Sequence, residues 1–475
     1  MRACRTIASA VTALAAIATL ASTALAAAPP LRRYPYLTDT VGSAATVNFG
    51  TDRTSTRAAV KWGRQGVESC TAHTAAATRT AITVNGVAEY QWTAPLDLAA
   101  DTAYCYRVYL EPSFQGQSEI DLLAMDAAPS FRTQVPAGSA EPFSFAVFGD
   151  WGQVDASGAN ADQANVLAGI AASGARFAFT TGDNAYPSGS QDNYGDLQQT
   201  GANLSGVFGP TFWTRPGRSV PVFPAIGNHG LNRADANHPH LLNWPQTRAV
   251  AASGGRYARD TYCCKNGTPS TALPSTWYAF SAGKARFYVL DAAWPDNLAG
   301  NATPQKNDFD YHWAQDAAEY KWLQADLAAH QGEMKFAVLH YPMYSDNATE
   351  GSDSYLRGKD KLEGLLNRYG TTIAFTGHSH VYERNTAVKK TGVVNYVTGG
   401  GGAAVEPIGA KGCSPWDAYG IGWSFSRSAG SACGAATPPA SVSQVFHFLL
   451  VTISGATVTV TPTDSTGRTF DVKSY

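Results

Sequence analysis

Five short polar blocks in the second part of the chain carry side chains that can bind metal ions. Each block follows an apolar run of strand length, and its members are carboxylates, a phenol, an amide or imidazoles. In chain order they are Asp150, Asp183 with Tyr186, Asn228 with His229, His340, and His378 with His380. One such block is a weak signal, but burying all five groups together without an ion would be costly. The five blocks therefore predict a metal site.

The residue types divide the predicted ligands between two kinds of ion. Carboxylates and a phenolate suit Fe(III), whereas imidazoles and an amide oxygen suit a divalent ion such as zinc, iron or manganese. Two ions would need a shared carboxylate. Two metals about 3.5 to 4 Å apart assist attack on phosphorus, because they activate a water and stabilise charge on the attacking and leaving oxygens. The negative charges of Asp150, Asp183 and Tyr186 would not cancel such a pair, so the centre would attract an anionic phosphate.

The apolar runs predict an α/β layered domain over residues 143–475. They alternate with stretches of helical spacing, such as residues 161–174 and residues 318–330, where Leu323 and Leu327 share a face. In such a domain the functional residues lie at the carboxyl ends of the strands. The C-terminal part returns to strands and is expected to complete the sheets.

Residues 31–133 predict a small all-β sandwich domain in front of the α/β domain. Short strands are separated by turn residues, and Tyr104, Tyr106 and Val108 alternate onto one face. The stretch 134–142 is rich in small residues and proline, which suits a linker between the two domains.

The first 26 residues have the features of a cleavable secretory signal. Arg2 and Arg5 precede the apolar run 7–21, and Ala24 and Ala26 form an A-x-A processing site. The run has about 15 residues, fewer than the roughly 20 that a membrane-spanning helix needs. We expect cleavage after Ala26 and a secreted or periplasmic protein.

Charge and cysteine content limit the partners and the compartment. The net charge of −2 provides no basic surface for nucleic acid, so small-molecule phosphate esters are the expected partners and stable membrane insertion is not expected. Of seven cysteines, Cys4 lies in the signal, and the even remainder favours disulfides in an exported chain. Cys70 and Cys105 are the expected pair, because both lie in one short segment.

The other four cysteines leave two arrangements open. Cys263 and Cys264 are adjacent, so they form either an unusual vicinal bridge or two separate bridges, with Cys413 and Cys433 as partners. A metal site built on cysteine is not expected, because the sequence has no C-x-x-C spacing.

The five blocks resemble the signature of the purple acid phosphatases, which belong to the calcineurin-like metallophosphoesterases. The matching motifs are D-x-G at Asp150, G-D-x-x-Y at Asp183 and Tyr186, G-N-H at Asn228 and His229, the strand-end His340, and G-H-x-H at His378 and His380. D-x-G together with the tyrosine is typical of the purple branch, since other branches have D-x-H and no tyrosine ligand. The segment 31–133 resembles the fibronectin type III-like domain of the larger, plant-type members.

The resemblance implies a role for each block residue. Fe(III) would be bound by Asp150, Tyr186 and His380. The divalent ion would be bound by Asn228, His340 and His378, with Asp183 bridging the two ions. His229 would be no ligand but would face the substrate, where it holds a phosphate oxygen or donates a proton to the leaving group. The implied activity is acid phosphatase-type hydrolysis of phosphate monoesters by attack of a metal-bound hydroxide.

The sequence departs from the family pattern at two places near the expected substrate. Family members usually carry an acidic residue after G-N-H, and here it is Gly230. The loop 341–355 contains no histidine, although family members often place substrate-contacting histidines there. His238 and His240 could take that role, or they could belong to a solvated surface loop.

Residues that flank the blocks have simpler expected roles. Trp151, Tyr341 and Tyr382 are expected to wall the cleft. The four glycines at 399–402 lack the G-K-[ST] of a phosphate-binding loop, so a turn near the metal site is expected there.

The sequence is also compatible with two other functions. The same metal centre could act as a phosphodiesterase or in a phospholipase-like reaction, because the ligands do not fix how many esters the phosphorus carries. The chain could also be an inactive binding protein that uses the sandwich for adhesion, although a complete set of ligands argues against it.

Overall fold

The computed structural model describes residues 30–111, 118–198, 206–230, 239–254, 259–261, 272–274, 277–293, 312–386 and 392–475. The predicted signal, residues 1–26, lies outside them, and so do His238, Cys263 and Cys264. Among the helices of the described part, none is long and apolar enough to cross a membrane.

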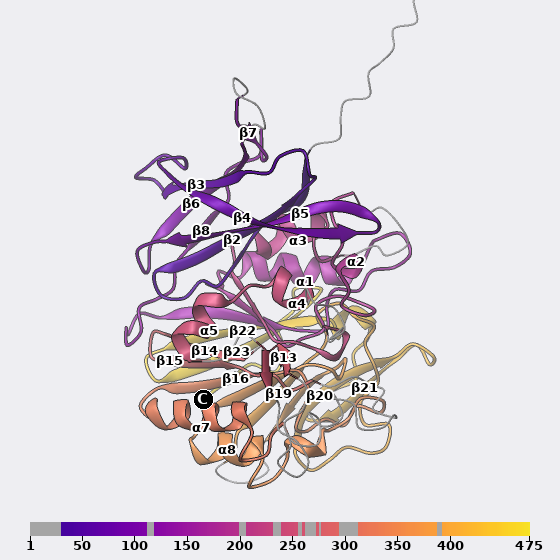
Figure 1. Ribbon diagram of the computed structural model, residues 1–475. Coiled ribbons are helices and arrows are strands. Elements are labelled where there is room, and N and C mark those ends of the chain that lie inside the picture. The colour runs from indigo at the N-terminus through magenta and orange to yellow at the C-terminus, as the bar shows by residue number, and fades with distance from the viewer. Residues whose placement is uncertain are drawn as a thin grey trace, which may run out of the picture.

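The N-terminal region is all-β, as predicted, and lies at the top of Figure 1. Its strands run in the order β1-β2-β5-β4-β3-β6-β7, with β8 also paired to β6. Their bounds are β1 (Leu31–Thr38), β2 (Ala44–Thr51), β3 (Ala58–Arg64), β4 (His73–Val84), β5 (Val87–Asp97), β6 (Ala103–Leu110), β7 (Ile120–Asp121) and β8 (Ser130–Arg132). The first part of β4 pairs with β3 and its second part with β5, so β4 joins two halves.

One apolar cluster fills the space between these two halves. It includes Phe49 and Trp92 from one half, and Val60 and Tyr106 from the other. The backbone N–H of Ala99 donates to the phenol oxygen of Tyr104 at 2.8 Å, a contact of the kind found in a tyrosine corner. The likeness to a fibronectin type III domain stays a prediction.

Two disulfides form in the described part. Cys70 bonds to Cys105, which confirms the expected pair. Cys413 bonds to Cys433, so the arrangement that pairs these two with Cys263 and Cys264 is wrong. Cys413 lies just before β20, and Cys433 lies on β21, which pairs antiparallel with β20. This hairpin brings the two sulfurs together, and the spacing of the cysteines in the sequence does not predict it.

The second region contains two large sheets, as the α/β prediction requires. The six-stranded sheet has the order β11 (Val222–Pro224), β10 (Ala178–Thr180), β9 (Phe143–Phe148), β22 (His447–Ser454), β23 (Thr457–Asp464) and β24 (Lys473–Ser474). The eight-stranded sheet has the order β14 (Tyr278–Ala282), β15 (Ala285–Val289), β16 (Met334–Val338), β17 (Ile373–Thr376), β19 (Val394–Thr398), β18 (Tyr382–Asn385), β20 (Asp417–Ser424) and β21 (Ala429–Gly434). A short pair joins β12 (Arg259–Thr261) to β13 (Ala272–Pro274). The C-terminal strands complete both large sheets, as expected.

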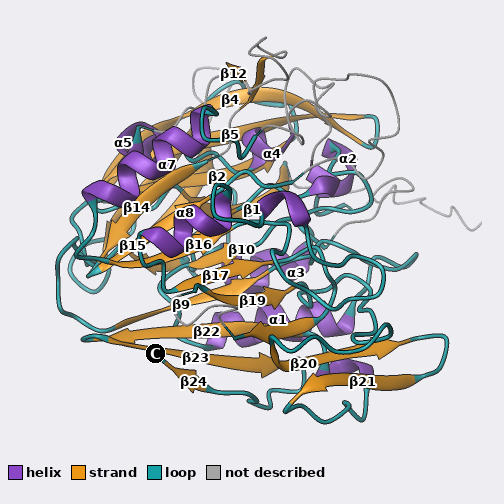
Figure 2. Cartoon of the chain, turned by 90° about the horizontal axis from the view of Figure 1, so that it is seen from below, coloured by secondary structure: helices purple, strands orange, loops and turns teal. Residues whose placement is uncertain are grey.

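The two large sheets pack face to face and are covered by helices on their outer sides. Phe145 and Phe179 of one sheet meet Phe287 and Phe336 of the other in a single buried cluster. The outer face of the six-stranded sheet packs against α1 (Ala161–Ala172), and that of the eight-stranded sheet against α7 (Ala318–Ala329) and α8 (Leu362–Arg368). Figure 1 shows α1 above the sheets and α7 with α8 below them, and Figure 2, the view from below, shows α7 and α8 in front of the strands. Shorter helices are α2 (Gln191–Tyr194), α3 (Pro210–Phe212), α4 (Pro239–Asn243) and α5 (Thr247–Ser253).

The central strands of both sheets are parallel. β9, β10 and β11 run together in one sheet, and β15, β16, β17 and β19 run together in the other. Parallel strands end at the same edge, so the segments that follow them meet there. This arrangement gathers the polar blocks at one edge of the molecule.

The two regions are packed tightly against each other. Arg33 of β1 is fully buried, and its guanidinium donates to the carbonyl of Gly195 at 2.9 Å and to the side chain of Asn243 at 2.8 Å. The phenol of Tyr36 donates to the Asn243 carbonyl at 2.6 Å. Val135, in the expected linker, is fully buried in the cluster between the large sheets. The start of the expected linker is thus fixed by packing, whereas residues 136–142 are mostly exposed.

Replacing Arg33 by alanine should destabilise the protein strongly. The change removes a buried cation together with its hydrogen bonds to Gly195 and Asn243, so we expect a loss of ~3 kcal/mol or more in the free energy of unfolding. The control is Arg132→Ala, which removes a half-exposed ion pair with Asp101 and should cost below ~1 kcal/mol. Urea unfolding compares the two variants, and equal effects would contradict the interface described above.

Candidate metal centre

The polar blocks follow the strands as predicted. Asp150 comes after β9, Asp183 and Tyr186 after β10, Asn228 and His229 after β11, His340 after β16, and His378 and His380 after β17. The first three strands belong to the six-stranded sheet and the last two to the eight-stranded sheet. The site is therefore built between the two sheets, with each sheet contributing side chains from its carboxyl edge.

Three of the site residues have unusual backbone conformations. Asp150, Asp183 and His378 have φ of 55°, 46° and 66°, in the left-handed region that residues with a Cβ rarely adopt. The backbone N–H of His378 donates to both carboxylate oxygens of Asp150, at 3.1 Å each. The N–H of His229 donates to Oδ1 of Asp183 at 2.9 Å. These bonds orient the two carboxylates, and strain of this kind is typical of functional positions.

Asp150, Tyr186 and His380 form one group of donor atoms. The Tyr186 phenol oxygen lies 3.4 Å from Oδ1 of Asp150 and 3.1 Å from Nε2 of His380. Oδ1 of Asp150 and Nε2 of His380 are 3.5 Å apart. Adjacent ligands on one metal, each bound at ~2.1 Å, would be separated by about 3 Å. The three atoms therefore have the spacing of three ligands of a single ion.

Asn228, His340 and His378 lie in a second group. Nε2 of His340 lies 2.6 Å from Oδ1 of Asn228, and the ring centroids of His340 and His378 are 5.2 Å apart. The ring of Tyr341 packs against His378, with centroids 4.1 Å apart. Tyr341 thus flanks a candidate ligand, as expected.

Asp183 lies between the two groups. Its Oδ2 is 3.2 Å from the Tyr186 phenol oxygen, whereas its Oδ1 is 3.4 Å from Nε2 of His340. Oxygens Oδ1 and Oδ2 thus face different groups of donors. Asp150, Asp183 and His340 also place one donor atom each within 4.8 Å of one another, which is close enough for metal ligands.

The imidazoles are oriented for metal binding through Nε2. Nδ1 of His340 lies 2.8 Å from the Thr181 carbonyl oxygen, and Nδ1 of His380 lies 2.9 Å from that of Ala404. A carbonyl oxygen can only accept, so both Nδ1 atoms carry a proton and Nε2 is the nitrogen left to bind a metal. Histidine ligands are commonly fixed in this way. The donor set of this site fits a metal pair.

Glycines make room for the carboxylate and the imidazole. A Cβ at Gly227 would collide with the carboxylate of Asp183. Gly182 has φ of 106°, and a Cβ there would come within 2.5 Å of the imidazole of His340. The turn at 399–402 also lies beside the site, as expected, because a Cβ at Gly399 would reach within 3.1 Å of the Asp150 carboxylate.

Burial of the acidic groups perturbs their protonation. Burial raises the pKa of Asp183, against the opposing effect of His340. Burial, followed by the charges of Asp183 and Asp150, raises the pKa of Tyr186 far above its usual value. In the absence of positive charge the phenol would keep its proton, so a strongly charged cation would be needed to make it a phenolate.

The histidines respond in opposite directions. Burial, together with His340 and His380, lowers the pKa of His378 well below its usual value, so its ring stays neutral. Burial also tends to lower the pKa of His380, but the hydrogen bond and the charge of Asp150 raise it to about 10. The second shift shows that the pocket around Asp150 attracts positive charge.

His229 lies at the border of the site and is partly exposed. Its Nε2 is 3.8 Å from Oδ2 of Asp183, and its ring centroid is 4.6 Å from that of Tyr186. Its Nδ1 contacts the carbonyl oxygen of Pro187. The family pattern has an acidic residue at the position of Gly230. In this chain the Pro187 carbonyl is the group that orients the His229 ring.

Two expectations about flanking residues are wrong. The ring of Trp151 is fully buried in the cluster around α1, with its N–H donating to Asn184 at 3.0 Å. Tyr382 is fully buried, and its hydroxyl donates to Asp471 at 2.7 Å. Both rings lie in hydrophobic cores and do not wall a cleft. Each follows a ligand residue in the sequence, but its side chain points into the core. Of the two alternatives for His240, the solvated surface loop is wrong, because the residue is buried on α4; a contact with substrate stays a prediction.

Glu350 is a residue of this site that sequence reasoning missed. Its Oε2 lies 4.0 Å from Nε2 of His380, and its carbonyl accepts a hydrogen bond from the Ser379 hydroxyl. Burial raises the pKa of Glu350 to about 8, against the opposing effect of His380. The loop 341–355 contains three acidic residues, and nothing in their spacing distinguishes this one.

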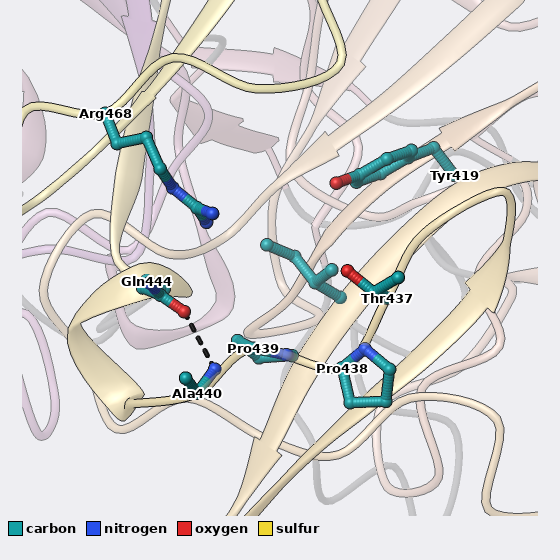
Figure 3. Close-up of a pocket in the computed structure, with 8 residues that line it drawn as sticks. Tyr419, Thr437, Pro438, Pro439, Ala440, Gln444 and Arg468 are labelled. Carbon is teal, nitrogen blue, oxygen red and sulfur yellow. Dashed lines mark hydrogen bonds between the residues drawn. The ribbon is translucent and has the colours of Figure 1, made fainter.

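A pocket of about 230 Å³ lies elsewhere in the same region (Figure 3). It is lined by Tyr419 and Ile421 of β20, the segment 437–440, Gln444 and Arg468. The guanidinium of Arg468 pairs with Asp464 at 3.1 Å. None of the predicted site residues lines this pocket, so we do not assign it to the metal centre.

Residues 143–382 match the family model of the calcineurin-like phosphoesterases. This segment is just over half of the 475-residue chain and contains every predicted ligand. The chain belongs to the calcineurin-like phosphoesterases. The fold of this phosphoesterase is similar to that of a purple acid phosphatase from yellow lupin seeds, with a TM-score of 0.62, 17% identity, and coverage of 94% of this chain and 74% of the lupin chain.

Two curated relatives have related activities in their names. An acid phosphatase of Aspergillus ficuum is 24% identical over 388 residues, which cover 63% of this chain and 60% of the relative. A nucleotide pyrophosphatase/phosphodiesterase of Hordeum vulgare is 25% identical over 288 residues, which cover 56% of this chain and 66% of the relative. The phosphoesterase thus spans less than two thirds of the length of either relative.

Replacing Asp183 by asparagine should reduce the binding of both ions. Each carboxylate oxygen faces a different group of donors, so loss of the charge affects both groups. We expect metal analysis of the purified variant to give less than one ion per chain. The control is Asp155→Asn, the same change on an exposed turn, which should keep the wild-type content. Two ions retained in Asp183→Asn would contradict a shared position.

Proposed function

We propose that this phosphoesterase is an exported, binuclear metal-dependent phosphatase that hydrolyses phosphate monoesters. The observation that carries the proposal is the position of Asp183, with one carboxylate oxygen beside Tyr186 and the other beside His340. A carboxylate placed in this way can be shared by two ions, and two ions suit phosphoryl transfer.

The proposed ligand assignment follows the two groups of donor atoms. Asp150, Tyr186 and His380 hold Fe(III), because carboxylate and phenolate oxygens favour a hard trivalent ion. Asn228, His340 and His378 hold a divalent ion, which is zinc, iron or manganese. The family relation and the acid phosphatase relative support a metal-dependent phosphoric ester hydrolase.

The chain's own residues would prepare the substrate for reaction. When bound, the two ions would activate a water and neutralise charge on the phosphate. The Pro187 carbonyl holds Nδ1 of His229, so Nε2 is the atom that can hold a phosphate oxygen or deliver a proton to the leaving alkoxide. Glu350 lies beside His380, with 4.0 Å between Oε2 and Nε2, and burial raises the pKa of its carboxyl to about 8, so in its protonated form it could donate to a phosphate oxygen.

Export and the division into domains are part of the same proposal. Two disulfides, Cys70 with Cys105 and Cys413 with Cys433, are typical of an oxidising compartment. We place a β-sandwich domain at residues 31–133, a connection at 134–142 and the catalytic domain at 143–475. The packing of the Arg33 side chain against the catalytic domain indicates that the sandwich has a structural role.

Paired assays test the proposed reaction. We expect the metal-loaded protein to hydrolyse p-nitrophenyl phosphate with at least ~10-fold higher kcat/KM than bis-p-nitrophenyl phosphate. The prediction rests on the two ions, whose positive charge suits a doubly charged, unshielded monoester. A clear preference for the diester would contradict the monoesterase proposal.

The second candidate function is a phosphodiesterase on the same centre. The relative from Hordeum vulgare, named as a nucleotide pyrophosphatase/phosphodiesterase, is the observation that favours it. The same pair of assays separates the two candidates, because only the number of esters on the phosphorus differs between the two substrates.

His229→Ala should lower the rate without loss of metal. His229 is not among the residues assigned to either metal ion, so the metal content should not change. Removal of a general acid typically lowers kcat by about 100-fold or more. The control is His330→Ala, which changes the histidine directly after the C-terminal end of α7; the side chains of His229 and His330 are 26% and 28% exposed. Steady-state kinetics with metal analysis checks both variants. Loss of metal from His229→Ala would show that His229 is a ligand.

A further inference from the structure

A second cluster of buried oxygen atoms lies where β18 meets β20. Asn385 of β18 and Asp417 of β20 are directly opposite in the antiparallel register. Glu383 lies two residues before Asn385 and faces the same side of the strand. Its cross-strand partner is Gly420, where a Cβ would come within 2.6 Å of Ile408 and 3.7 Å of Glu383, so only glycine fits there. The three polar side chains therefore share one face.

Four oxygens of this cluster have no hydrogen-bond donor in the described part of the chain. They are Oε1 of Glu383, both carboxylate oxygens of Asp417, and Oδ1 of Asn385. Glu383 and Asn385 are fully buried, and Asp417 is 7% exposed. The amide nitrogen of Asn385 donates to the carbonyl of Tyr344 at 2.9 Å, which fixes the orientation of the amide.

Asp346 adds a third carboxylate next to the cluster. Its backbone N–H donates to Oε2 of Glu383 at 3.1 Å, and its own carboxylate accepts from the Ser414 hydroxyl at 2.7 Å. Among the ion pairs of the described residues, none joins a lysine or arginine to Asp346, Glu383 or Asp417. Arg357 lies over the ring of Tyr344, 4.4 Å from its centroid, and is not paired with any of the three.

Buried carboxylates without a cation are costly, so positive charge must be supplied. Burial, followed by the neighbouring Glu383, raises the pKa of Asp417 well above its usual value. A proton shared by Glu383 and Asp417 would supply part of the charge. It would leave Oδ1 of Asn385 without a partner, because a single proton bridges only two oxygens. A metal ion can bind all three side chains.

We propose that Glu383, Asn385 and Asp417 form a binding site for a hard divalent cation such as Ca²⁺, separate from the metal centre. Carboxylate and amide oxygens, with no nitrogen or sulfur among them, are the ligands that calcium prefers, and water completes its shell. A cation here joins β18 to β20 and, through Asp346, to the loop that carries Glu350. It therefore stabilises one wall of the metal centre without taking part in the reaction.

Equilibrium dialysis against ⁴⁵Ca²⁺ tests the site on the full chain with its metal centre filled as purified. We expect one calcium per chain in the wild type and at least tenfold weaker binding in Asp417→Asn, which keeps the size of the side chain. The matched control is Asp360→Asn, an exposed aspartate with a 51% exposed side chain, which should bind calcium like the wild type. No bound calcium in the wild type would overturn the proposal.

Thermal unfolding with and without CaCl₂ provides a second readout. Calcium should raise the Tm of the wild type and of Asp360→Asn, but not that of Asp417→Asn or Glu383→Gln. If calcium leaves the Tm of the wild type unchanged and the two variants are more stable than the wild type, the carboxylates instead share a proton, and the proposal is wrong. If both variants fail to fold, dialysis of the wild type alone decides. Neither readout uses phosphatase activity, so a failure of the calcium proposal can be told apart from a failure of the proposed function.

Discussion

The second region of the molecule is organised around buried negative charge where the parallel central strands of two sheets end. The exposed fractions of Asp150 and Asp183 are 0% and 1%, and no lysine or arginine pairs with either in the described residues. Among the basic side chains of the described residues, only imidazoles come within 4 Å of them. Two buried carboxylates beside a buried phenol would oppose folding unless cations compensated for them. The fold therefore presents a site that is complete only with positive charge.

This constraint explains several features of the backbone. Asp150 and Asp183 adopt positive φ, which turns their carboxylates toward one another and toward the opposite sheet. The N–H groups of His378 and His229 then hold those carboxylates in place. Glycine is required at Gly227 because any side chain would occupy the space of the Asp183 carboxylate. The interleaved phenylalanines between the sheets provide the rigid support that such strained turns need.

Much of this arrangement could be predicted from the sequence, because it depends on local pattern. Apolar runs of strand length followed by polar turns identify strand ends, and α1 and α7 form where helical spacing indicated them. Parallel order then brings the ends together. The pairing of Cys70 with Cys105 was predictable for the same reason, since both residues lie in one short β region.

The features that sequence reasoning missed depend on long-range packing. Trp151 and Tyr382 follow ligand residues in the sequence, but the direction in which their strands and turns face places both rings in cores. Glu350 approaches His380 only because its loop folds back over the end of β17. The oxygens of Glu383 and Asp417 meet across a register shift between β18 and β20, which sequence spacing does not encode.

The absorption spectrum of the purified protein, with metal analysis, tests the central claim most directly. If Tyr186 and Asp150 hold Fe(III) beside a divalent ion, the protein should be coloured by a phenolate-to-iron charge-transfer band. That band should be absent from Tyr186→Phe, which removes only the oxygen. The account predicts one iron and one divalent ion per chain in the wild type. A colourless, iron-free protein with full activity would contradict it.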